Sequence, residues 1–208
     1  MAITGASGAV YARHLARRIV DSGAHLHLVA SPGGRRVLAD ELDLRQLTPD
    51  TLVGTVAPAA TLYPCQDLGA QIASGSFHTD GMVICPCSSN TLAKVAAGLG
   101  DNLVTRAALV TLKEARRLIL VTRETPLSQI EIANMLRVSQ AGGIVCPASP
   151  GFYMRPTAVD ELVDFVVGRV LDLLGLAHEL DTRWDPQASP RRAQPRLTSS
   201  RPRPTAQE

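Results

Sequence analysis

A short run of apolar residues, followed by small polar residues and then by a helical pattern, recurs along this chain. Its clearest copy is the apolar run 81–85, the polar stretch 86–91 and a helical pattern over 92–99. A buried strand is expected to end here, where Pro86 interrupts its ladder, and hydroxyl and amide side chains stand where the next helix begins. Free N–H groups at such a helix start favour the binding of phosphate.

The same unit predicts most of the secondary structure. We expect further strands over 1–4, 24–30, 118–121 and 144–146, and helices over about 9–22, 35–41, 102–117, 128–139 and 159–174. Residues 44–80 are expected to hold one helix beginning at Thr48, one short strand and a mobile loop. Apolar strands that alternate with helices predict an α/β sandwich of three layers, in which helices cover both faces of a parallel central sheet.

Composition divides the chain into a domain and a tail. Residues 1–184 are expected to form one domain, and 185–208 a disordered tail with five Arg, two acidic residues and almost nothing apolar. The tail carries a net charge of +3 and the whole chain +2, so the domain is close to neutral. A neutral domain argues against a nucleic-acid partner. No apolar run reaches the length of a membrane span and no leader is evident, so a cytoplasmic protein is predicted.

Cysteine usage indicates neither disulfides nor a metal site. A cytoplasmic location keeps thiols reduced, and Cys85 and Cys87 flank a proline at the end of a strand, which is not a zinc-ligand spacing. We therefore expect all four cysteines to act as small apolar residues and no metal to be bound.

Five strand-to-helix turns are expected to meet at one edge of the parallel sheet, outside the carboxyl ends of the strands. They supply small residues, hydroxyls, helix starts and a cation, a combination that suits a flat phosphorylated cofactor. The turns are Gly5-Ala6-Ser7, Ser31-Pro32, Ser88-Ser89-Asn90-Thr91, Arg123-Glu124, and Ser149 to Tyr153.

Each of these signals also has a plainer interpretation. The turn at Gly5 lacks the G-x-G-x-x-G spacing and is compatible with simple helix packing, and the hydroxyls of Ser88 and Thr91 are compatible with helix capping. The cations Arg106, Lys113 and Arg169, with Tyr153, indicate a second anion site, although a single such cation more often extends to solvent.

Several motifs together resemble the UbiX family of flavin prenyltransferases, over about residues 2–184. The resemblance is carried by Thr4-Gly5-Ala6-Ser7-Gly8, 74–77 with 79–88, Asp101-Asn102-Leu103, 123–128, Asn134-Met135-Leu136, and 147–153 with Pro156. It implies a flavodoxin-like Rossmann domain that binds FMN and assembles as a homododecamer with active sites at subunit junctions. The implied reaction joins a dimethylallyl group from dimethylallyl phosphate to N5 and C6 of reduced FMN, and the prenylated product serves UbiD-type decarboxylases.

The resemblance also assigns roles to residues. It implies FMN contacts from Gly5, Ala6, Ser7, Ser31, Ser88, Ser89, Asn90, Thr91 and Arg123, and dimethylallyl phosphate contacts from Tyr153 and Arg169, helped by Arg106 and Lys113. Glu124 resembles the acid/base residue, and Glu41 and Trp184 resemble active-site residues near the prenyl group. A monophosphate held by side-chain cations would not require Mg²⁺, and no D-D-x-x-D cluster of carboxylates is present.

Two features depart from the family pattern. The chain starts four residues before Gly5, so either the first strand is clipped or the start lies upstream. His78 stands where Arg or Lys is common, so its loop is expected to respond to pH.

Two other functions remain open at this stage. The stretch Pro86 to Thr91 also resembles the homo-oligomeric flavin-containing cysteine decarboxylases, which need a catalytic His before that motif and a Pro-x-Met-Asn segment; here Pro126-Leu127-Ser128 stands in the corresponding region. A non-catalytic FMN-binding module is the second alternative.

Overall fold

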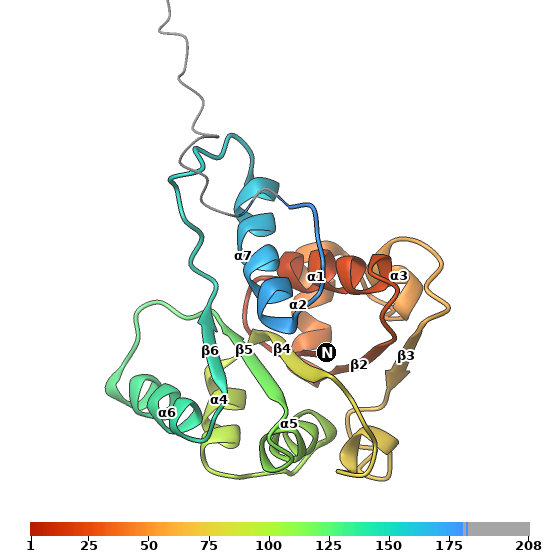
Figure 1. The fold of residues 1–208 in the computed structure, drawn as a ribbon, viewed down its shortest axis with the longest axis vertical. Helices are drawn as coiled ribbons and strands as arrows, with labels where there is room; N and C mark the ends of the chain where they lie inside the picture. Colours follow the sequence, from red (N-terminus) through yellow and green to blue (C-terminus); the bar gives the residue numbers. More distant parts are fainter. Residues whose placement is uncertain (181, 183–208) are drawn as a thin grey trace, which may run out of the picture.

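The computed structural model of this chain describes residues 1–180 and 182. Its centre is a six-stranded parallel sheet in the order β3-β2-β1-β4-β5-β6 (Figure 1). The strands are β1 (Ala2–Ile3), β2 (Leu26–Ala30), β3 (Ala60–Tyr63), β4 (Gly81–Cys87), β5 (Arg117–Thr122) and β6 (Ile144–Pro147). The helices are α1 (Ala9–Asp21), α2 (Pro32–Leu42), α3 (Pro49–Val53), the 3₁₀ turn η1 (Gln71–Ala73), α4 (Ser89–Ala96), α5 (Leu103–Lys113), α6 (Gln129–Gln140) and α7 (Val159–Leu174).

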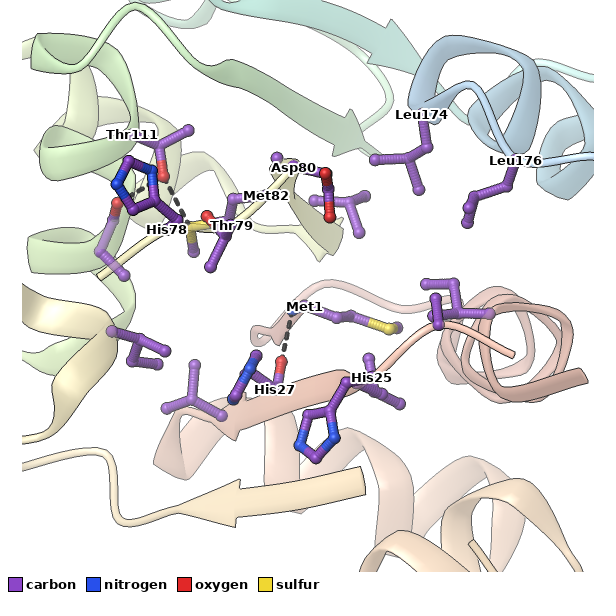
Figure 2. A pocket seen from close by; sticks show the side chains of 18 residues that line it. Met1, His25, His27, His78, Thr79, Asp80, Met82, Thr111, Leu174 and Leu176 are labelled. Carbon is purple, nitrogen blue, oxygen red and sulfur yellow. Dashed lines mark hydrogen bonds between the residues drawn. The ribbon is translucent and has the colours of Figure 1, made fainter. Parts of the chain in front are cut away.

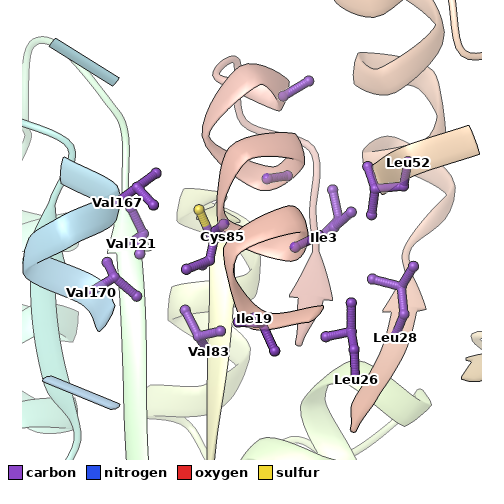
Figure 3. Packing of buried hydrophobic residues seen from close by; sticks show 14 of the residues in the cluster. Ile3, Ile19, Leu26, Leu28, Leu52, Val83, Cys85, Val121, Val167 and Val170 are labelled. Carbon is purple, nitrogen blue, oxygen red and sulfur yellow. The ribbon is translucent and has the colours of Figure 1, made fainter. Parts of the chain in front are cut away.

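The two faces of the sheet carry separate cores, because successive strand residues point to opposite sides. On β4 and β5, Val83, Cys85, Ile119 and Val121 pack toward α1 and α7. Figure 3 shows part of this core, with Val167 of α7 on one side. The alternate strand residues pack toward α4, α5 and α6: Met82, Ile84, Leu118 and Leu120. The predicted three-layer, flavodoxin-like sandwich is confirmed.

Most predicted elements are present, with local differences in their bounds. The helix expected over 102–117 ends at Lys113, because β5 already begins at Arg117. The strand expected to stop before Pro86 continues to Cys87, and its pairing with β5 shifts between Ile84 and Cys87. Pro86 has no N–H to donate, so it interrupts the pairing of β4 with β5 at that point without ending the strand.

Residues 44–80 hold the helix and the strand expected there. The side chain of Thr48 caps α3, as the sequence predicts, and β3 follows at the edge of the sheet. The loop expected to be mobile is anchored, because the guanidinium of Arg116 donates to the carbonyl oxygens of Gly75 and Phe77 at 2.6 and 2.7 Å.

The predicted tail, residues 185–208, and Trp184 lie outside the described residues. Within the part of the chain that the structure describes, no helix is long and apolar enough to cross a bilayer.

Close packing of α2 on β1 brings the first two turns of the sheet edge together. Gly34, in the first turn of α2, lies so close to β1 that a Cβ built on it would overlap the carbonyl oxygen of Ile3. A side chain here would therefore push α2 away from the strand.

We predict that Gly34→Ala lowers the free energy of unfolding by about 1–3 kcal/mol, the usual cost of overpacking. A loss of stability would be informative, because alanine in a helix interior is otherwise favoured over glycine by about 1 kcal/mol. Urea denaturation measures the change. Gly69→Ala is the control, since the nearest atom to its Cβ lies at an ordinary 3.4 Å; equal stability of the two variants would contradict the prediction.

Candidate active site

Three helix starts line one cavity of about 440 Å³ at the carboxyl edge of the sheet. Ser31, Ser88 and Asn102 precede α2, α4 and α5, and each side chain accepts a hydrogen bond from the backbone N–H three residues later, at 3.0, 3.3 and 3.2 Å. Other first-turn N–H groups stay available, and the positive ends of three helix dipoles face the same space. The cavity therefore favours an anionic group such as a phosphate.

The floor of this cavity is backbone rather than side chain. A Cβ on Gly5 would lie 3.2 Å from Cα of Gly33, so the β1 and β2 turns approach this closely only because both residues are glycine. Gly5, Ser31, Ser88, Asn90 and Thr91, all predicted FMN contacts, line the cavity together. A flat phosphorylated cofactor fits a site with this open floor and these donors.

The cavity also contains an ion pair that was not among the predicted site residues. Lys94 Nζ lies 2.6 Å from Asp101 Oδ2, and both residues line the wall. The hydrogen bond and charge of Lys94 hold the pKa of the Asp101 carboxyl below its usual range. The sequence signal was present, because Lys94 follows Thr91 by three residues on the same face of a helix that starts at a predicted phosphate site.

The remaining FMN-contact candidates form the adjoining rim. Arg123 Nε donates to the carbonyl oxygen of Ser7 at 3.1 Å, which joins the end of β5 to the turn after β1. Ser89 Oγ donates to Glu124 Oε2 at 3.2 Å, so the predicted acid/base carboxylate is oriented by the start of α4. Ala6 of the same turn is buried.

Glu41 joins this rim from α2 and caps α1, which has no local side-chain cap. Its carboxylate accepts hydrogen bonds from the N–H groups of Gly8 at 2.9 Å and Ala9 at 2.8 Å. Partial burial raises the pKa of Glu41, but hydrogen bonds from the Ser7 side chain and these two N–H groups outweigh it, so the pKa is lowered. The carboxylate is thus held in its charged form beside Arg123.

Other predicted site residues lie apart from the cavity within this chain. Lys113 ends α5, four residues before β5 begins, so it lies at the opposite, amino-terminal edge of the sheet and pairs with Glu114. The cations expected to share a second anion site are therefore divided between different parts of the chain.

Arg106 and Arg169 also bind neighbouring groups outside the cavity. Arg106 Nε donates to the carbonyl oxygen of Ala73 at 3.2 Å. Arg169 is exposed on α7 and pairs with Asp172 at 3.2 Å. Tyr153 follows β6 and contacts the ring of Phe165 edge-on, with 5.7 Å between the ring centroids.

A second cavity, of about 290 Å³, lies at the amino-terminal edge of the strands (Figure 2). It opens next to Met1, where the two-residue β1 is shorter than its neighbours β2 and β4. His78 lines this second cavity and not the first. His78 therefore lies at the opposite edge of the sheet from the three helix starts.

The four cysteines are free thiols. Burial raises the pKa of Cys87 to about 12 and raises the pKa of Cys85 further, so both stay protonated and act as core residues. Among the described residues, no group of three or more His, Cys, Asp or Glu side chains is placed to hold a metal ion.

Fold and cavity together define a class: a doubly wound α/β protein whose carboxyl sheet edge suits a flat, phosphorylated cofactor. The family model described as Flavoprotein matches residues 1–171. Flavin prenyltransferase UbiX of Halalkalibacterium halodurans is 46% identical over 186 residues, 88% of this chain and 90% of that protein. The chain therefore belongs to the flavoprotein family and, within it, to the UbiX flavin prenyltransferases.

Solved structures agree with this assignment. A crystal structure of AnUbiX (PadA1) in complex with FMN and dimethylallyl pyrophosphate matches with a TM-score of 0.80 and 38% identity, over 88% of this chain and 95% of that one. A dodecameric FMN-dependent UbiX-like decarboxylase from Escherichia coli O157:H7 matches with a TM-score of 0.79 and 40% identity, over 88% and 97% of the two chains.

We predict that Glu41→Gln lowers the free energy of unfolding at pH 7 by about 1 kcal/mol, the usual worth of a helix cap. Because the folded-state pKa of Glu41 is lowered, its contribution is present above the unfolded pKa and is lost as pH falls through the folded value. The stability difference between variant and wild type should therefore shrink below about pH 4.

Urea denaturation at a series of pH values measures this difference. Asp40→Asn is the control, since it removes a neighbouring carboxylate that pairs with the exposed Arg36 on the same helix. A Glu41→Gln effect that stays constant down to pH 3 would show that the carboxylate charge does not stabilise α1.

Proposed function

We propose that this chain is a flavin prenyltransferase that binds FMN in the cavity at the starts of α2, α4 and α5. It joins a dimethylallyl group from dimethylallyl phosphate to N5 and C6 of reduced FMN. The observation that carries the proposal is the convergence of three capped helix starts on one glycine-floored cavity. The activity of the H. halodurans relative and the two ligands of the AnUbiX complex support it.

Some residues of the chain bind FMN, and others take part in the reaction. Backbone N–H groups and the hydroxyls of Ser31, Ser88 and Thr91 hold the FMN phosphate, and Arg123 fixes the rim through Ser7. Reduced FMN supplies the nucleophilic atoms that accept the dimethylallyl group. The second bond uses the C=C bond of the dimethylallyl group, which gains one proton as flavin C6 loses another, and Glu124, oriented by Ser89, takes up the proton from C6.

The departing phosphate of the prenyl donor needs cations where its negative charge develops. Arg169, Tyr153, Arg106 and Lys113 are the proposed donors, with Trp184 and Glu41 near the prenyl group. Lys113 and Glu124 stand at opposite edges of the sheet, and β5, whose six residues span about 20 Å, runs between these edges. One chain therefore does not bring both to one small substrate, and we propose that adjacent copies supply them.

This division supports assembly into a homo-oligomer, for which the dodecamer of the E. coli relative is the model. Apolar side chains on α6 offer a surface for such contacts: Ile130 is 69% exposed, Ile132 54% and Leu136 58%. We further propose a cytoplasmic location, delivery of the product to a UbiD-type decarboxylase, and a catalytic domain that extends to residue 184.

The cysteine decarboxylase alternative is disfavoured by the sequence. That family needs a Pro-x-Met-Asn segment where this chain has Pro126-Leu127-Ser128, and the H. halodurans relative at 46% identity is a flavin prenyltransferase. A non-catalytic FMN-binding module, which would only carry the flavin, would have no use for the Glu124 carboxylate that Ser89 holds beside the cavity.

The proposed function is tested by the mass of the flavin. Incubation with reduced FMN and dimethylallyl monophosphate should yield a flavin heavier by one dimethylallyl unit, and parallel reactions with the diphosphate establish which donor is used. Mass spectrometry of the released flavin is the measurement. Bound but unmodified FMN would favour the carrier, and loss of CO₂ from a peptide with a carboxy-terminal cysteine would favour the decarboxylase.

A mixing experiment tests the shared site. Glu124→Gln and Lys113→Ala should each lower product formation by about 10²-fold or more. Refolding the two variants together should restore part of the activity, because some junctions then combine an intact Glu124 with an intact Lys113. Each variant refolded alone is the control. Mixtures no more active than the single variants would place both residues in the site of one chain.

A further inference from the structure

The wall of the FMN cavity contains one pair of opposite charges whose role the reaction above leaves open. Among the described residues that line the cavity, Lys94 is the one cation and Asp101 the one anion. The side chain of Lys94 is 28% exposed, so most of it is removed from water. A charge in such a position acts on a ligand more strongly than the same charge on an open surface.

The direction of Lys94 follows from its place on α4. It lies six residues after the cap Ser88, and helical side chains lean toward the amino end of their helix. This lean carries the ammonium toward the helix start, where the proposed phosphate site lies. Among the described residues, its one ion-pair and hydrogen-bond partner is Asp101, so two of its three N–H donors remain for a ligand.

Hydrogen bonds that do not involve Lys94 already hold Asp101 at the start of α5. Its Oδ1 accepts hydrogen bonds from Asn102 Nδ2 at 3.0 Å and from Thr105 Oγ1 at 3.3 Å. This fixes Asp101 and, through it, the ammonium of Lys94. A bare carboxylate in this wall would repel a phosphate, and Lys94 neutralises it.

We propose that Lys94 is a phosphate-binding residue of this chain: it donates to the phosphate of FMN while Asp101 holds it in place. Asp101 is then a positioning residue. The inference rests on the proposed binding of FMN in this cavity, and it adds a charged contact to the neutral donors of the helix starts. It also explains how a carboxylate is tolerated beside an anion.

Comparing FMN with riboflavin isolates the phosphate, because riboflavin carries the same ring system and ribityl chain without that group. Lys94→Met keeps the apolar stem and removes the charge. Loss of a charge-assisted hydrogen bond should raise the Kd of FMN about 10- to 100-fold. The Kd of riboflavin should change less than about threefold, and quenching of flavin fluorescence measures both.

Further variants separate a direct contact from a structural one. Lys94→Arg should keep most of the preference for FMN, because it retains a cation at this position. Lys94→Met combined with Asp101→Asn should bind FMN more tightly than Lys94→Met alone, since the unpaired carboxylate is gone. Arg45→Gln is the matched control, as it breaks the exposed ion pair with Asp43 and should leave both Kd values unchanged. Thermal unfolding of each variant confirms that it is folded.

The outcomes distinguish this inference from the function on which it rests. Equal weakening of FMN and riboflavin by Lys94→Met, or no weakening of either, overturns the role of Lys94 and leaves the proposed function standing. A wild-type protein that binds both flavins equally well overturns it too, because no phosphate contact then contributes. A wild-type protein that binds neither flavin overturns the proposed function itself.

Discussion

The parallel direction of the strands determines where this protein can bind a ligand. Each crossover returns the chain to the same edge, so the helices that follow β2 and β4 start there, and the break between α4 and α5 adds a third start. The partial positive charges of these starts add up in one cavity. The Lys94 ammonium adds to that charge, while the carboxylate of Asp101 offsets part of it. The charges that would bind an anionic ligand are thus in place before the ligand binds.

The sequence predicted the parts of this arrangement that depend on local chemistry. Thr48, Ser88 and Asn102 stand before helices because their side chains satisfy N–H groups within the same turn, and that relation spans only three residues. The apolar runs of β4 and β5 were equally legible, since a strand buried on both faces needs apolar residues on each. The sheet and its functional edge therefore followed from short stretches of sequence.

The features that the sequence did not reveal depend on contacts between distant parts of the chain. Glu41 caps a helix that begins 32 positions earlier in the chain, and no pattern within α1 or α2 indicates that pairing. Lys113 carries the same charge at either edge of the sheet, and only the direction and length of α5 decide between them. Pro86 predicted a strand end from its missing N–H, but the neighbouring Thr4 donates to its carbonyl oxygen at 3.1 Å and β4 continues.

In the proposed reaction the two phosphates have opposite fates, and the donors available to them differ accordingly. The phosphate of FMN has to stay, and backbone N–H groups, capping hydroxyls and a lysine anchored by Asp101 are donors that need no rearrangement to hold it. The phosphate of the prenyl donor has to gain charge and leave. Exposed cations on long side chains, such as Arg169 and Lys113, can follow a moving charge and be shared between copies of the chain. A rigid cavity within the chain, completed by mobile cations from outside it, therefore suits a reaction in which one phosphate is an anchor and the other a leaving group.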